Sequence, residues 1–211
     1  MPGNAPGRSY AAITEEQLER LSTVATKDHE RFTAAANRRP YAGRRLLVAL
    51  ARGAAQHYLD CRDGVPEPYG VSDFEVWSFY AAIRGTPFPG HERISHKSIS
   101  HDRPPMPPDS PPGTKKTAKP GDVIERFRRP RRPHRFIAEP GDAVTLRMTS
   151  LPCDVSASQD GAVQVLQAAL RLAADQEPGR QLSWYLAQKP LVLIDPAGRR
   201  GAVIWRPPGG S

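Results

Sequence analysis

The chain has only two cysteines among its 211 residues, Cys61 and Cys153, and they lie far apart. Such a pair matches neither a disulfide framework nor a zinc motif. The sequence also lacks any run of about 18 apolar residues, which excludes a transmembrane helix. Residues 1–7 have neither the basic start nor the apolar centre of a secretory signal. We therefore expect a cytoplasmic protein with no membrane partner, whose length fits one ordinary domain.

The chain has a net positive charge, and nearly all of the excess comes from one segment. The formal net charge is +8, and residues 91–135 hold 12 Lys and Arg against five Asp and Glu. Residues 104–121 contain seven prolines and almost nothing apolar. A segment of this composition cannot bury enough apolar surface to offset its ordering entropy. The sequence thus predicts a long disordered, basic, Pro-rich insertion at 90–135.

The end of this insertion carries a cluster of arginines interrupted by prolines, which we call the basic arm. Its arginines are Arg126, Arg128, Arg129, Arg131, Arg132 and Arg135. An extended arm of this kind can neutralise several phosphates, with strong salt dependence and little sequence preference. It therefore predicts contact with nucleic acid or with an acidic protein partner, for example in a toxin–antitoxin or defence system. A solvated loop, rich in arginine because of a GC-rich genome, is the alternative.

Regular structure is predicted from residue 14 onward, after a flexible stretch over 1–13. Thr14 and Gln17 have the spacing of a helix capping box, and apolar residues then recur at helical intervals, so a helix is expected over 14–36. Residues 45–59 fit two structures equally, either one buried helix or a strand, a glycine turn and a helix.

The remaining segments complete the expected fold. Their patterns predict strands at 70–80 and 142–150, a helix from 160, a short helix over 183–188, and a hairpin of 191–194 with 202–205. This order is that of a single α+β domain over 14–211, with a mixed central sheet flanked by helices.

Two acids dominate the strand at 70–80. Asp73 and Glu75 are two residues apart, so a strand places both side chains on one face. Neighbouring carboxylates repel each other unless a cation or a hydrogen-bond donor lies between them. The pair therefore predicts a site, although an acidic pair on a solvated strand face is the commoner origin of such a pattern.

With Gly53 and Ala54 before it, this acidic strand resembles nucleotidyltransferase-superfamily domains of the polymerase-β kind. In that family a glycine and a small residue form a phosphate-binding turn after one strand, and an Asp-x-Asp or Asp-x-Glu strand follows. The resemblance implies that Asp73 and Glu75 are catalytic and bind Mg²⁺, and that Gly53 and Ala54 contact a nucleoside triphosphate. It implies a nucleotidyltransferase-like fold and function, active or degenerate.

The sequence departs from the family in three places. Ala54 stands where the family usually has Ser or Gly, and the turn is farther from Asp73 than is typical. The strand best placed to supply the family's third acid offers Thr145 and Arg147 on its polar face, and such an arginine could neutralise the pair without a metal. The alternative is a non-catalytic binding module that uses the basic arm.

The chain is also similar to small actinobacterial-type proteins of unassigned function. The likeness lies in Asp73–Phe79 and Ser183–Lys189, and it adds no mechanism. A restriction-endonuclease-like metal site fits less well, because Trp77 stands where that class has a lysine. His91 and His96 are five residues apart, which does not match the i, i+4 spacing of a zinc-protease helix. For His57, packing in a helix is the simplest expectation.

Overall fold

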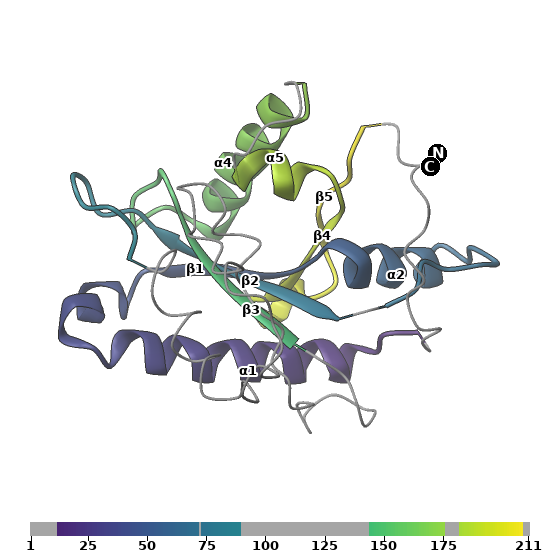
Figure 1. The fold of residues 1–211 in the computed structure, drawn as a ribbon, viewed down its shortest axis with the longest axis horizontal. Coiled ribbons are helices and arrows are strands. Elements are labelled where there is room, and N and C mark those ends of the chain that lie inside the picture. The colour runs from purple at the N-terminus through teal and green to yellow at the C-terminus, as the bar shows by residue number, and fades with distance from the viewer. Residues whose placement is uncertain (1–11, 72, 90–143, 176–181, 209–211) are drawn as a thin grey trace, which may run out of the picture.

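The structure is a computed structural model, and it describes residues 12–71, 73–89, 144–175 and 182–208. Its centre is a five-stranded sheet with the order β3-β2-β1-β4-β5 (Figure 1). β2 and β3 are parallel, and the other neighbouring strands are antiparallel. The predicted α+β domain with a mixed sheet flanked by helices is confirmed.

The first half of the domain supplies the centre of the sheet. Its elements are α1 (Glu15–Thr33), the 3-10 helix η1 (Ala36–Tyr41), β1 (Arg45–Ala51), α2 (Arg52–Arg62) and β2 (Phe74–Ala81). α1 begins at the predicted capping box, in which the Thr14 side chain accepts from the Gln17 backbone N–H and the Gln17 side chain accepts from the Thr14 N–H. β1 passes directly into α2, so the strand-then-helix alternative is the one that forms.

The second half adds both edges of the sheet. Its elements are β3 (Val144–Leu151), α4 (Gln159–Ala174), α5 (Leu182–Ala187), β4 (Leu191–Asp195), the 3-10 helix η3 (Ala197–Arg199) and β5 (Val203–Trp205). β4 and β5 form the expected closing hairpin. β3, α5, β4 and β5 lie within two residues of their predicted bounds, and α4 begins one residue before the predicted start at 160. η3 lies between the two strands of the hairpin, where no helix was predicted.

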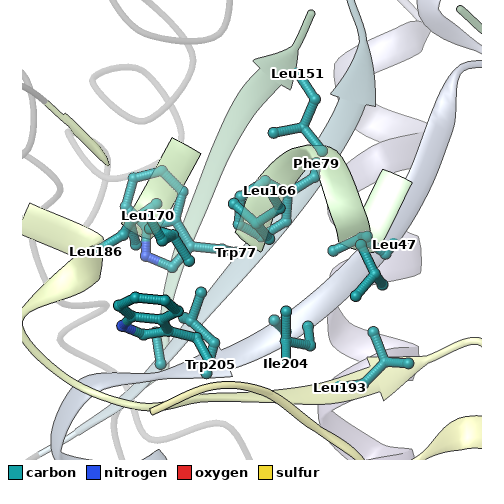
Figure 2. Packing of buried hydrophobic residues seen from close by; sticks show 14 of the residues in the cluster. Leu47, Trp77, Phe79, Leu151, Leu166, Leu170, Leu186, Leu193, Ile204 and Trp205 are labelled. Carbon is teal, nitrogen blue, oxygen red and sulfur yellow. The ribbon is translucent and has the colours of Figure 1, made fainter. Parts of the chain in front are cut away.

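Helices cover both faces of the sheet. α1 lies along one face and α4 and α5 lie on the other (Figure 1). The α1 side is packed with aliphatic side chains, including Val48, Leu50 and Val76. The α4 side holds larger rings, and Figure 2 shows Trp77 and Trp205 among the leucines of this cluster. Because both faces are buried, the alternation along β2 distributes its side chains between two cores.

The start of the domain and the end of α1 differ from their predicted positions. α1 ends at Thr33, before the predicted 36, and the 3-10 helix that follows contains Pro40. Ile13 is buried, so the packed domain begins at least one residue before 14. The predicted insertion at 90–135 lies outside the described residues. No helix in the described ranges is long and apolar enough to cross a membrane.

Candidate functional site

Glu75 lies in the middle of a set of donors on the α4 side of the sheet. The Trp77 indole N–H donates to Glu75 Oε1 at 2.8 Å, and the Tyr185 hydroxyl lies 3.3 and 3.2 Å from the two carboxylate oxygens. The Glu75 side chain is 7% exposed. A buried carboxylate needs such partners, because water no longer stabilises its charge.

Arg147 of β3 supplies the opposite charge. Its Nε lies 3.2 Å from Glu75 Oε1, and its own side chain is 8% exposed. The guanidinium also lies over the rings of Trp77 and Tyr185, at 5.6 and 5.8 Å from their centroids. Burial lowers the pKa of Arg147, while Glu75 opposes that shift. The pair therefore forms a buried ion pair enclosed by aromatic rings.

Asp73 is half-buried, just before β2 begins. It accepts a hydrogen bond of 2.8 Å from the Thr145 hydroxyl. Thr145 pairs with Glu75 in the parallel register of β2 and β3, so it lies beside both acids. The sequence expectation for β3 is thus confirmed, since Thr145 and Arg147 share the face that carries Glu75.

The predicted phosphate turn adjoins the acids. Ala51, the last residue of β1, pairs with Glu75, and α2 begins at the next residue. Gly53 follows in the first turn, where an added Cβ would come within 3.0 Å of the Tyr69 ring. Ala54 is fully buried in the α1-side core. The structure therefore places the predicted phosphate turn beside the acidic strand. The close approach of the Tyr69 ring explains why residue 53 is a glycine.

Three further residues belong to the site: Arg52, Lys189 and Tyr185. Sequence reasoning assigned Tyr185 to the core and did not single out the two cations. Arg52, the first residue of α2, has a φ of 60°, and its guanidinium lies 4.3 Å from the Tyr185 ring centroid. Lys189 lies over Tyr69, with its Nζ 4.7 Å from the ring centroid. Both cations are half-buried. An arginine at positive φ costs roughly 1–2 kcal/mol and persists only where surrounding contacts impose it.

Tyr185 links these groups. Its hydroxyl meets Glu75 while its ring lies under Arg52. Burial, and then the Glu75 charge, raise the pKa of Tyr185 to about 12. The phenol therefore stays protonated at neutral pH and remains a donor to Glu75. The only sequence signal for it was an aromatic pair shortly before a lysine, and such a pair more often belongs to a core.

Magnesium fits the arrangement poorly. Indole, phenol and guanidinium groups already approach the oxygens of Glu75, so they occupy positions that a metal would need. Within the described ranges no three His, Cys, Asp or Glu residues are grouped so as to hold a metal. Two cations, Arg52 and Lys189, lie beside the turn, and a third neutralises Glu75. The charge balance favours an anion over a cation, and Mg²⁺ at Asp73 and Glu75 stays a prediction.

Comparisons with known proteins name no relative. A scan against protein-family models and searches of curated proteins and of solved structures found no match to this chain. The arginines of the basic arm lie outside the described residues.

Proposed function

We propose that this chain is a degenerate nucleotidyltransferase-like domain that binds a phosphate-bearing ligand without transferring it. A nucleoside triphosphate is the appropriate probe. The observation that carries the proposal is Arg147, which is paired with Glu75 on the strand from which that family takes its third carboxylate. An arginine there stabilises Glu75 without a metal and removes the charge that would hold Mg²⁺.

The arrangement of the strands supports the likeness to that family. A strand-to-helix junction lies directly beside the acidic strand, because Ala51 pairs with Glu75. The neighbouring strand on the other side of β2 is β3, which carries Thr145 and Arg147 on the shared face. These are the places where the family puts its phosphate turn and its third acid, so the residues differ while their positions correspond.

Phosphate binding is supported by the two half-buried cations at the junction. Arg52 and Lys189 each stack on a tyrosine, and the Arg52 backbone N–H donates to the Pro190 carbonyl oxygen, next to Lys189. An arginine fork and a nearby ammonium are suited to phosphate oxygens. Stacking on Tyr185 and Tyr69 fixes the two cations before a ligand arrives, which lowers the entropic cost of binding.

Calorimetry with each nucleoside triphosphate, with and without Mg²⁺, tests the proposal. We expect binding that does not require Mg²⁺ and that weakens by about tenfold in Arg52→Gly, since a charge-assisted contact contributes roughly 1.5–3 kcal/mol. Glycine suits a φ of 60°, so this variant removes the side chain while keeping the backbone. Arg20→Gln, in an exposed ion pair on α1, is the matched control for lost charge.

Asp73→Asn separates the degenerate domain from an active one. Without a metal, Asp73 repels a triphosphate, so the variant should bind it more tightly. If Asp73 and Glu75 hold Mg²⁺, the same variant should lose binding. Absence of binding to all four triphosphates, or binding that requires Mg²⁺ and disappears in Asp73→Asn, would overturn the proposal.

The second candidate function is polyanion binding by the basic arm, carried by the concentration of charge in residues 91–135. Affinity for a generic duplex should fall steeply between low and physiological salt, and deletion of residues 126–135 should abolish it. Affinity that is unchanged by salt or by the deletion would reject this candidate.

A further inference from the structure

Cys61 and His57 form a thiol–imidazole pair on α2, apart from the acidic site. They are four residues apart, so the helix places them on one face. The Cys61 Sγ lies 3.4 Å from His57 Nε2. Cys61 is half-buried, while His57 is 1% exposed.

The other imidazole nitrogen fixes the tautomer. His57 Nδ1 lies 2.7 Å from the Tyr69 carbonyl oxygen, and a carbonyl oxygen can only accept. Nδ1 therefore carries the ring proton, and Nε2 of the neutral ring presents its lone pair to Cys61. The thiol S–H donates to that lone pair, which is the arrangement of a nucleophile next to an oriented base.

The loop after α2 holds the base in place. The Asp60 carboxylate accepts from the Tyr69 backbone N–H at 2.8 Å, so both backbone polar groups of Tyr69 are bound to α2. The second oxygen of Asp60 accepts from the Gln56 side chain at 2.7 Å. His57 cannot turn away from Cys61 without breaking the bond to Tyr69.

We propose that Cys61 is a reactive thiol that exchanges with small disulfides, with His57 as its base. The Cys61 Sγ attacks one sulfur of the disulfide, a new S–S bond forms, and the original S–S bond breaks. The thiol proton passes to His57 Nε2 and then to the departing thiolate. Burial, and then Asp60, raise the pKa of the Cys61 thiol. The contact of 3.4 Å between Sγ and His57 Nε2 provides the proton acceptor.

Cys153 provides a control within the same chain. It too is half-buried, an aspartate follows it, and burial and then Asp154 raise the pKa of its thiol. The two cysteines thus share burial and an acidic neighbour and differ in the imidazole that faces Cys61.

Mass spectrometry of the full chain, treated with oxidised glutathione at pH 7, measures both rates at once. We expect Cys61 to react about tenfold faster than Cys153, and the His57→Gln substitution to remove this advantage. In high urea both cysteines should react at similar rates, which would show that the fold creates the difference. Equal rates in the folded protein, or a difference that persists in urea, would overturn the proposal.

Single-cysteine proteins give a second measurement that does not depend on His57→Gln folding. With Cys153→Ser, the rate at Cys61 should depend weakly on pH between 6.5 and 8. With Cys61→Ser, the rate at Cys153 should rise about tenfold per pH unit below its thiol pKa. A tenfold rise per pH unit at Cys61 as well would show that His57 does not act as its base.

Discussion

The two ends of β2 are both buried, yet they are stabilised in opposite ways. At the start of the strand Glu75 is neutralised by Arg147 and bound by Trp77 and Tyr185. At its end Tyr80 packs in a cluster of rings with Phe32, Tyr41 and Phe88, at centroid separations of 5.1–6.2 Å. A chain that needed only stability could have built both ends from rings. The buried ion pair of Glu75 and Arg147 is therefore the reason that the first end is the candidate site of the proposed function.

The largest expected effect is at the charged end, in Arg147→Met. The substitution leaves Glu75 buried without its counter-charge, and such changes cost about 3–5 kcal/mol. Urea denaturation should show this loss in the free energy of unfolding. Adding Glu75→Gln to it should restore much of the loss, because the double variant buries no charge. Strictly additive losses would mean that the ion pair is not the stabilising unit.

Asp28 is a titratable group near Tyr80, at the end of β2 that packs in the ring cluster. It is half-buried on α1, and burial raises its pKa from 3.8 to about 6, which Arg31 partly opposes. The folded protein therefore holds this proton more tightly than the unfolded chain does. The resulting stability is complete below pH 3.8 and is lost as the pH rises through 6.

The Asp28→Asn variant should consequently unfold like the natural protein near pH 3.5 and be more stable above pH 6. We expect a difference of about 1–2 kcal/mol, below the full value of the pKa shift because solvent screens a half-buried group. Burial, and then Arg45, lower the pKa of the neighbouring His29, so its protonation weakens the fold in both proteins as the pH falls. A difference that is independent of pH would contradict this account.

Two tyrosines in the ring cluster should respond differently to loss of the hydroxyl. The Tyr80 hydroxyl lies 3.0 Å from His29 Nδ1, so Tyr80→Phe should lose about 1 kcal/mol. The Tyr41 hydroxyl is buried and has no hydrogen-bond partner within the described part of the chain. Tyr41→Phe should therefore be neutral or slightly stabilising in thermal unfolding. Equal losses in the two variants would show that a residue outside those ranges binds Tyr41.

The smallest stability effect is expected at Arg52. Arg52→Gly relieves the positive φ and loses the Tyr185 stacking, which are opposing terms of about 1 kcal/mol each. Arg52→Ala keeps the unfavourable φ and loses the stacking, so it should be the less stable variant. Chemical denaturation of both would compare them. Equal stability would indicate that the backbone at residue 52 relaxes.

Local patterns were enough to predict most elements, and for a physical reason. The capping box at Thr14 and the alternation along β3 depend on neighbours within a few residues, so the sequence shows them directly. The side chains of Thr145 and Arg147 could be placed on the polar face for the same reason. The segment 45–59 could not be assigned, because a short apolar run fits a strand or a helix until packing selects one.

From the sequence alone it could be predicted that Asp73 and Glu75 share a strand face and that Arg147 lies on another strand, and β3 does carry Arg147 beside β2. Only the tertiary structure decided what surrounds them. Tyr185 reaches Glu75 from 110 residues away, and Tyr69 fills the space above Gly53. These contacts follow from how helices close over the sheet, which no local pattern encodes. They place a neutralised carboxylate, Glu75, beside two half-buried cations, Arg52 and Lys189, while Mg²⁺ at the acidic strand stays a prediction.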